Sequence, residues 1–208
     1  MHRPVPTPWI PDAPLLLAST SPTRRVLLEG AALPLETAAP GIDERAVEAA
    51  GAGLAPPDLA RRLAEAKAAA VASRHPDRIV IGADQVLDLG GEVFHKPADA
   101  AAARAHLARL AGRTHALHSG VAIAAGGRVA ESFVETAHLT LRPLDAGQIA
   151  AYVELAGETR VTASVGAYQL EGLGIHLFAG VAGEHSTILG LPLLALLARL
   201  RARGLLRL

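Results

Sequence analysis

The clearest phosphate chemistry in the sequence lies between Ser19 and Arg25, where two serine hydroxyls precede two arginines. Ser21 can cap a helix and Pro22 suits its first position, so this segment predicts a helix N-terminus. The free N–H groups and the dipole of such a terminus attract phosphate, and Arg24 adds a forked donor. The alternative is an ordinary capped helix with two solvated arginines. Taken by itself, this segment favours that alternative.

Carboxylates follow at two further places. Asp84 comes directly after residues 78–83, whose β-branched side chains predict a strand, and Asp43 and Glu44 follow Gly41. A carboxylate at the carboxyl end of a central strand lies where α/β folds bind ligands. Its oxygens can hold Mg²⁺ or accept a proton from water. The alternative role for Asp84 is to cap a turn or a helix.

Lysine is scarce in this chain. Only two of the 20 basic residues are lysines, Lys67 in a predicted helix and Lys96 just before Pro97. In an arginine-rich chain, a remaining lysine indicates a place where a compact ammonium is needed and a planar guanidinium does not fit. Chance is the alternative. Together with Asp84 and the Ser19–Arg25 segment, the two lysines predict a site for phosphate, a metal ion and water.

The composition excludes several other kinds of chemistry. The 208 residues contain no cysteine, so disulfides, thiol nucleophiles and cysteine metal sites are excluded. Twenty acidic residues balance twenty basic ones and only 3% of residues are aromatic, which argues against a nucleic-acid partner. The histidines form no HExxH pair, and no GxSxG elbow is present. His115 and His118 are expected on opposite faces of a strand, at surface or supporting positions.

The sequence shows no pattern typical of a membrane or export segment. The first 14 residues contain five prolines and no continuous apolar run. The apolar run over residues 188–198 contains Gly190 and Pro192 and is shorter than the roughly 20 residues that a spanning helix needs. We therefore expect a cytoplasmic protein without a membrane partner.

Apolar patterns and turn signals predict an α/β fold. The predicted strands cover residues 15–18, 35–38, 78–83, 115–124, 129–141, 164–170 and 175–181. The predicted helices cover residues 22–31, 57–73, 97–110, 145–155 and 192–203. Glycine pairs at 90–91 and 126–127 predict two hairpins. This order favours a mixed twisted sheet with flanking helices. Residues 1–13 are expected to form an irregular arm, and residues 14–208 a single two-lobed domain.

Nine short motifs occur in register from about residue 15 to residue 200. They are STSPTRR (19–25), GIDE (41–44), LAEAKA (63–68), IGADQV (81–86), KP (96–97), GRTH (112–115), GAY (166–168), EGLG (171–174) and GLPL (190–193). In this combination the sequence resembles the Maf family of nucleoside triphosphate pyrophosphatases. The resemblance implies a fold like that of inosine-triphosphate pyrophosphatases, with two lobes around a cleft. It also implies hydrolysis of a nucleoside triphosphate to its monophosphate and pyrophosphate, with Mg²⁺ or Mn²⁺.

The resemblance further implies a role for each motif residue. Asp84 matches the proton acceptor, and Glu44, Lys67 and Lys96 match charged catalytic positions. Asp84 and Glu44 would hold the metal ion. The positions that bind phosphate are matched by Ser19, Ser21, Arg24 and Arg25. The positions linked to substrate choice are matched by Thr23, Gln85 and Glu171.

A homodimer is also implied by the resemblance. The C-terminal leucines Leu205, Leu206 and Leu208 would pack on the partner. Alternatively, they close the chain's own core.

The motifs differ from those of pyrimidine-type members, which resemble SPRRR, GADTV and IQGxG where this chain has SPTRR, GADQV and LEGLG. Gln85 and Glu171 resemble the subgroup that acts on 7-methyl-GTP. A carboxylate at Glu171 can accept both N1–H and 2-NH₂ of guanine, whereas uracil and thymine present one N–H between two carbonyls. Other interpretations remain open: a dTTP or UTP pyrophosphatase, a nucleotide-binding regulator of septum formation with little turnover, or an α/β domain for another phosphorylated metabolite.

Overall fold

The computed structural model describes residues 6–208. Residues 1–5 of the predicted arm lie outside the described residues. Residues 6–13 contain no helix or strand, apart from a bridge between Trp9 and Leu206. Contacts divide the chain into two compact units. Unit 1 comprises the residues up to Asp84, Ser119–Glu135 and His185–Leu208, and unit 2 comprises Gln85–His118 and Thr136–Glu184.

Seven strands form a mixed sheet in the order β2–β1–β3–β5–β6–β7, with β4 paired to β3. Their bounds are β1 (Leu15–Ala18), β2 (Leu35–Thr37), β3 (Val80–Leu89), β4 (Glu92–Phe94), β5 (Thr114–Ala125), β6 (Arg128–Leu141) and β7 (Phe178–Ala182). β1 is parallel to β2 and β3, whereas the pairs β3–β4 and β6–β7 are antiparallel. The predicted α/β class with a mixed sheet and flanking helices is confirmed. The cleft between two lobes stays a prediction.

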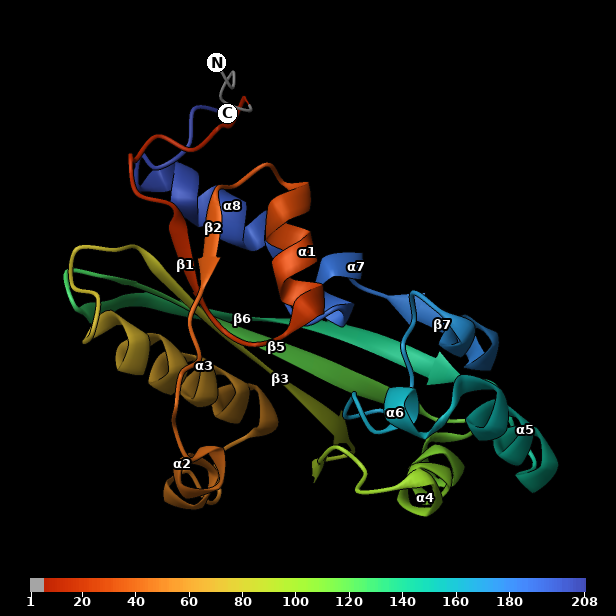
Figure 1. The fold of residues 1–208 in the computed structure, drawn as a ribbon. Helices are drawn as coiled ribbons and strands as arrows, with labels where there is room; N and C mark the ends of the chain where they lie inside the picture. The colour runs from red at the N-terminus through yellow and green to blue at the C-terminus, as the bar shows by residue number, and fades with distance from the viewer. Residues whose placement is uncertain (1–5) are drawn as a thin grey trace. The chain divides into compact units, whose positions relative to one another are not determined.

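Helices cover both faces of the sheet in unit 1 (Figure 1). They are α1 (Pro22–Gly30), α3 (Pro56–Ala72), α7 (His185–Ile188) and α8 (Leu193–Ala202). The remaining helix of this unit, α2 (Glu44–Ala50), contacts α3. Side chains alternate along a strand, so Leu17 and Ile81 pack with α1 and α8, whereas Leu16 and Val80 pack against α3. Asp84 has the same parity in β3 as Val80, which directs its carboxylate to the α3 face.

The end of the chain packs on its own unit. Leu206 is buried and Leu205 packs against the same core as α8, while Leu208 is 81% exposed. The expectation that all three leucines face a partner is therefore wrong for Leu205 and Leu206, because burial in their own core already accounts for them. The homodimer itself stays a prediction.

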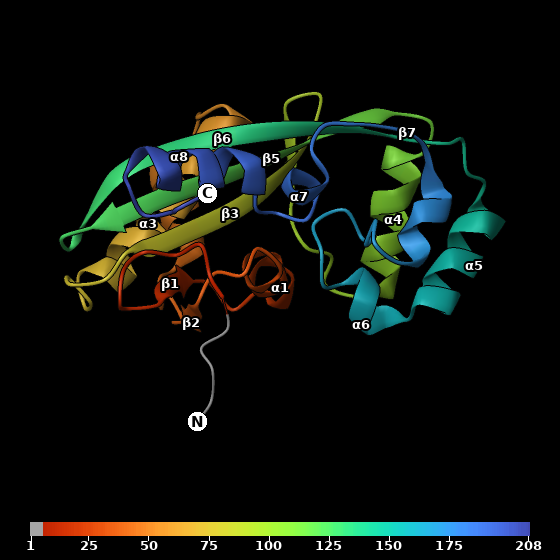
Figure 2. The ribbon, with the colours of Figure 1, turned by 90° about the horizontal axis from the view of Figure 1, so that it is seen from above.

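Unit 2 contains the helices α4 (Ala100–Leu110), α5 (Ala146–Ala156) and α6 (Glu158–Val161) and the 3₁₀ helix η1 (Leu173–Leu177). α4 and α5 lie side by side (Figure 2). Asp145 caps α5, which begins within one residue of the predicted start. α4 begins three residues later than predicted, because Asp99 accepts the N–H of Ala102 and is the N-cap. Asp145 and Gln148 form a reciprocal capping box.

Two sequence expectations about strands are wrong. β3 does not end before Asp84 but continues to Leu89, because its second half is largely buried and pairs with β4. Residues 164–170 form turns instead of a strand. Ala167 has a φ of 58°, outside the β region, and the Ser164 hydroxyl donates to the Tyr168 carbonyl, which closes a loop.

Other boundaries also differ from expectation. The predicted strand at 175–181 begins only at Phe178, since η1 occupies the residues before it. The helices α2, α6 and α7 were not predicted; each has seven residues or fewer, too short for an amphipathic pattern to emerge.

Polar aromatic side chains are buried in unit 2. His115 Nε2 lies 2.5 Å from the Tyr168 hydroxyl, and His118 Nδ1 lies 2.8 Å from Thr136 Oγ1. Burial lowers the pKa of His115 to about 4 and raises the pKa of Tyr168. Of the two positions expected, the surface position is wrong for both histidines, because β5 is buried on both faces from its second to its eleventh residue. A supporting role stays a prediction.

We expect buried His115 to destabilise the fold in mild acid. Its folded-state pKa of about 4 lies below the ordinary 6.5, so the unfolded chain takes up the proton first as the pH falls. The penalty is absent well above pH 6.5, grows below it, and is about 2 kcal/mol near pH 5. Thermal unfolding near pH 7.5 and pH 5 should show a larger loss of stability for the wild type than for His115→Gln. Equal losses would contradict this expectation.

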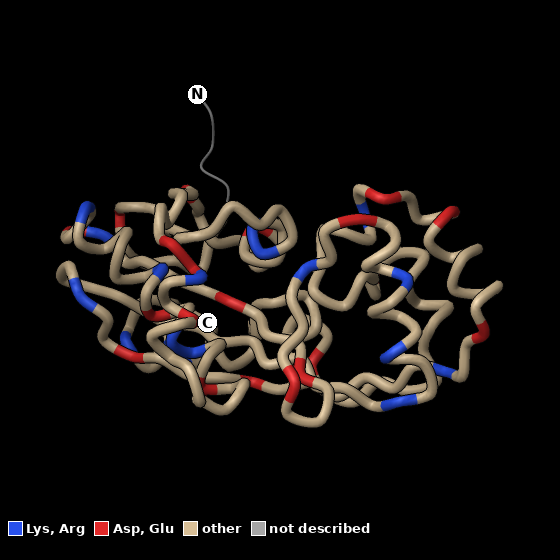
Figure 3. The backbone as a smooth tube through the Cα atoms, turned by 90° about the horizontal axis from the view of Figure 1, so that it is seen from below, with Lys and Arg blue, Asp and Glu red and all other residues tan. Residues whose placement is uncertain are grey.

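Acidic and basic residues are interspersed along the backbone (Figure 3), in keeping with the balanced charge of the sequence. Among residues 6–208, no helix has both the length and the hydrophobicity needed to cross a membrane.

Candidate active site

A buried ion pair lies on the α3 face of the sheet in unit 1. The ammonium of Lys67, on α3, donates to the carboxylate of Asp84, on β3, and the two side chains are only 8% and 12% exposed. Ala64 and Ala68, on the buried face of α3, pack against the sheet and bring the helix close to it. The structure thus brings together two residues that the sequence singled out separately.

Glu44 joins this pair from a third element. It is the first residue of α2, whose N-terminus is capped by Asp43 accepting the N–H of Ala46 at 3.1 Å. Glu44 Oε1 lies 2.8 Å from Lys67 Nζ, and the glutamate side chain is 54% exposed. One lysine therefore contacts two carboxylates, one buried and one in reach of solvent.

The predicted phosphate segment forms the N-terminus of α1. Ser21 caps the helix by accepting the N–H of Arg24. The guanidinium of Arg24 turns back, so that Nη1 donates to Ser19 Oγ at 3.3 Å and Nε donates to the Gly190 carbonyl at 2.8 Å. Buried Ser19 also accepts the N–H of Ser21 at 3.2 Å. Two hydroxyls and one guanidinium thus share a network at a helix N-terminus.

Arg24 is electrostatically linked to the two carboxylates. Burial lowers the pKa of its guanidinium, and the negative charges of Asp84 and Glu44 oppose that shift. Arginine nevertheless stays protonated in proteins. Arg24 and Lys67 therefore act as two cations on the same two acids, within one unit. Such a set of donors and acceptors can bind phosphate oxygens and a water molecule.

Arg25 and Thr23 have different surroundings. Arg25 Nε lies 2.6 Å from Glu29 Oε1, one turn along an exposed face of α1, which matches the alternative of a solvated arginine. Thr23 is half-buried in the first turn of α1. Their predicted roles in phosphate binding and substrate choice stay predictions.

Three predicted site residues belong to unit 2. Gln85 follows Asp84 in β3, and adjacent strand residues project to opposite faces. Lys96 is exposed in the segment between β4 and α4, and Glu171 is exposed in the turn before η1. The roles assigned to these residues stay predictions.

Asp84 and Glu44 fit one mode of divalent-metal binding. In the described part of the chain, no three histidine, aspartate or glutamate side chains gather into a metal site of their own. Mg²⁺, however, is usually bound by one or two carboxylates together with water and substrate phosphates. Two carboxylates that meet at Lys67 provide hard oxygen ligands for such a shared site.

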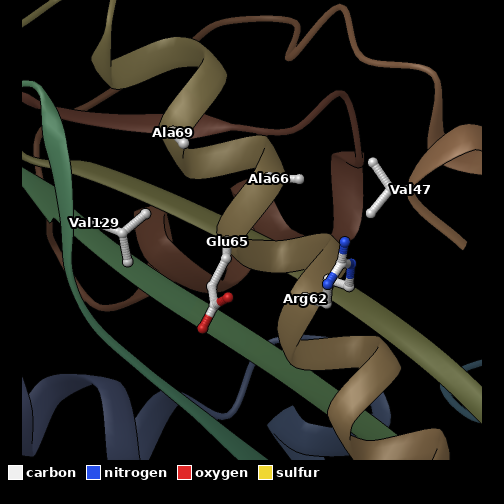
Figure 4. Close-up of a pocket in the computed structure, with 6 residues that line it drawn as sticks. All are labelled: Val47, Arg62, Glu65, Ala66, Ala69 and Val129. Atoms are coloured by element: carbon white, nitrogen blue, oxygen red, sulfur yellow. The ribbon is translucent and has the colours of Figure 1, made fainter. Parts of the chain in front are cut away.

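A hollow of about 520 Å³ lies elsewhere on unit 1, on the outer side of α3 (Figure 4). It is lined by Val47, Arg62, Glu65, Ala66, Ala69 and Val129. Glu65 accepts a hydrogen bond from the Ser132 hydroxyl at 2.5 Å. None of the predicted site residues lines this hollow, so it is distinct from the predicted site.

Sequence reasoning missed the part played by Gly190. Its carbonyl holds Arg24 Nε, its φ is +89°, and a Cβ there would lie 3.4 Å from two guanidinium nitrogens. The signal available was a glycine two residues before Pro192, at the start of a predicted helix. A backbone acceptor has no residue type of its own, so the sequence indicated the turn but not the contact.

The fold and this network define an α/β protein with a lysine–carboxylate centre and an arginine-bearing helix N-terminus. A family model described as "Maf-like protein" matches residues 14–203. The chain therefore belongs to the Maf family, and the resemblance found in its motifs is confirmed.

Relatives with names support this assignment. The chain is 50% identical over 200 residues to a "Nucleoside triphosphate pyrophosphatase" of Rhodopseudomonas palustris, with 96% of this chain and 98% of that protein covered. It is 52% identical, with the same coverage, to a protein of that name from Nitrobacter winogradskyi. It is also 50% identical over 189 residues to a "7-methyl-GTP pyrophosphatase" of Brucella abortus, with 90% and 94% covered.

Proposed function

We propose that this chain hydrolyses a nucleoside triphosphate to a nucleoside monophosphate and pyrophosphate. The observation that carries the proposal is the contact of one buried lysine with two carboxylates, on which Arg24 also acts. This arrangement combines a candidate base with cations that suit a polyphosphate. The names of the three relatives support the same reaction.

In the proposed mechanism, Asp84 accepts a proton from the attacking water. The water oxygen bonds to the α-phosphorus while the bond from that phosphorus to the bridging oxygen breaks, and pyrophosphate leaves with the bonding electrons. Lys67 orients the Asp84 carboxylate through their ion pair. Arg24, Ser19 and Ser21 bind phosphate oxygens, and Lys96 adds a cation that stabilises the leaving group.

The proposed cofactor is Mg²⁺ or Mn²⁺. Asp84 and Glu44 would hold it together with phosphate oxygens of the substrate. When bound, the cation supplies positive charge that stabilises the growing negative charge on the phosphates.

Product analysis tests the proposed reaction. The purified protein is incubated with Mg²⁺ and a panel that includes 7-methyl-GTP, GTP, dTTP and UTP, and the products are separated by anion exchange. We expect monophosphate and pyrophosphate in equal amounts. Diphosphate with orthophosphate would contradict the proposal, and so would binding of nucleotides without turnover.

A guanine-type base, as in 7-methyl-GTP, is the proposed substrate preference. The exposed carboxylate of Glu171 can accept two N–H donors from the guanine edge but would repel the carbonyls of a pyrimidine. The name of the Brucella abortus relative supports this preference. A preference for dTTP or UTP is the competing outcome.

Replacing Glu171 by glutamine should change this preference. We expect Glu171→Gln to shift the ratio of kcat/KM values toward UTP and dTTP by about tenfold or more, because one hydrogen-bond mismatch is worth ~1–3 kcal/mol. Glu158→Gln removes a carboxylate from the exposed side of α6 and serves as the control. An unchanged ratio, or a wild type that prefers dTTP to 7-methyl-GTP, would reject the base assignment but not the reaction.

We further propose a homodimer in the cytoplasm. Light scattering at micromolar concentration tests the dimer, and a single species of 21.4 kDa would contradict it.

A further inference from the structure

Helix α3 approaches strand β3 so closely that no side chain fits between them at Gly82. A Cβ on Gly82 would lie 2.3 Å from the Ala64 carbonyl oxygen and 2.6 Å from the Ala68 nitrogen. Both are backbone atoms of α3, which cannot rotate away as the end of a flexible side chain can. A side chain at position 82 therefore requires the helix or the strand to move.

A second glycine produces the same closeness further along the helix. Gly120, in the neighbouring strand β5, would place a Cβ 2.3 Å from the Ala60 carbonyl oxygen and 2.7 Å from the Arg61 nitrogen. Most strand residues carry a Cβ that holds a helix away from the sheet backbone. Here one position in each of two adjacent strands, Gly82 and Gly120, has no Cβ, and the backbone of α3 occupies the space at both.

The two contacts lie at different distances from the candidate catalytic lysine along α3. The Gly82 contacts at Ala64 and Ala68 bracket Lys67 in the sequence, whereas the Gly120 contacts lie about two turns before it. Gly82 also stands two residues before Asp84, on the same face of β3. The closest approach of helix and strand therefore coincides with the ion pair between Lys67 and Asp84.

We propose that Gly82 and Gly120 are positioning residues, which set the depth of α3 on the sheet and thereby place the Lys67 ammonium on the Asp84 carboxylate. The ion pair needs this depth because the side chain of Lys67 is only 8% exposed, so that the position of the helix backbone fixes where Nζ can lie. If α3 lay farther from the sheet, Lys67 would lose its ion pair with Asp84 and point toward Glu44 and solvent. This inference rests on the proposed function only in the expected effect on activity.

The first test reads the position of Lys67 without using activity. The chain has only two lysines, one buried and one exposed, so acetylation by a water-soluble reagent compares them within one molecule by mass spectrometry. We expect Lys67 to react much more slowly than Lys96 in the wild type. Gly82→Ala should abolish most of this difference, and Gly120→Ala should reduce it less. Gly180→Ala, at a glycine of β7 where an added Cβ would meet no atom within 4 Å, should leave it unchanged.

The second test asks whether the effect on activity passes through Lys67. A displacement of about 1 Å at a catalytic group can cost ~100-fold in rate, so we expect Gly82→Ala to lower kcat by that order while KM changes little. In a Lys67→Met background, Gly82→Ala should cause almost no further loss of kcat. A purely structural role would lower activity and stability equally in both backgrounds.

Each outcome decides between the claims. Unchanged protection of Lys67 in folded Gly82→Ala and Gly120→Ala would overturn the proposal. Failure of both variants to fold would also overturn it, since the glycines would then serve folding and not lysine placement. Loss of protection with full activity would uphold the positioning role and reject Lys67 from the proposed mechanism.

Discussion

Asp84→Asn should lower kcat by about 10²–10⁴-fold, the usual effect of removing a positioned general base. Asparagine keeps the shape of the side chain but cannot accept the proton of the attacking water. The buried carboxylate also contacts Lys67 and can bind a cation, and both interactions weaken when its negative charge is removed. Steady-state kinetics at saturating Mg²⁺ measures the loss.

A matched control separates this effect from a general change of charge. Asp77→Asn removes one negative charge from an exposed position before β3 and should leave kcat unchanged. Circular dichroism shows whether Asp84→Asn remains folded. Near wild-type turnover in a folded Asp84→Asn protein would remove Asp84 from the proposed mechanism.

Lys67→Arg and Lys96→Arg should both reduce activity, but only the first should reduce stability. The Lys67 side chain is buried against Asp84, and a larger planar guanidinium there overpacks the site at a cost of about 1–3 kcal/mol. Lys96 is exposed, so its replacement should leave the melting temperature unchanged. Kinetics and thermal melting of both variants measure the two effects.

The same pair of variants tests the inference that the two remaining lysines occupy positions where arginine does not fit. Arg61→Lys, at an exposed position paired with Asp58, provides a control in which arginine and lysine should be interchangeable. If both lysine-to-arginine variants keep full activity, the survival of two lysines in an arginine-rich chain is coincidence.

Much of the fold could be predicted from the sequence because its signals are local. Ser21 caps α1 as the sequence predicts, with Pro22 at the first helical position. Asp145, the first residue of the helix predicted over residues 145–155, is the N-cap of α5. The glycine pair at 126–127 separates β5 from β6 as expected. These signals depend on one turn of chain, so no tertiary contact had to be known.

Other features depend on contacts that no local pattern contains. β3 continues through Asp84 because β4 pairs with its second half, so a polar residue can lie inside a strand. Residues 164–170 include Val165 and Tyr168, which favour strands, yet a hydroxyl-to-carbonyl contact and a left-handed Ala167 turn them into a loop. In β3 the pairing with β4 overrides the local signal, whereas in residues 164–170 a hydrogen bond between residues four apart does so.

The candidate site also has a part that the sequence indicated and a part that only the structure shows. Residue types indicated Asp84, Lys67 and Glu44, and the structure joins them in one network. Gly190 contributes a backbone carbonyl that accepts from Arg24. Gly82 and Gly120 contribute by having no side chain, which lets the backbone of α3 approach the sheet. Such contributions become visible only when distances are known.

The most direct test of the proposed reaction is hydrolysis in water enriched in ¹⁸O. Attack on the α-phosphorus places the label in the nucleoside monophosphate and leaves the pyrophosphate unlabelled. Mass spectrometry of the two products after a single turnover should show one ¹⁸O atom in the monophosphate alone. Label in the pyrophosphate would mean attack on the β-phosphorus, and label in orthophosphate would mean attack on the γ-phosphorus; either result would contradict the proposed mechanism.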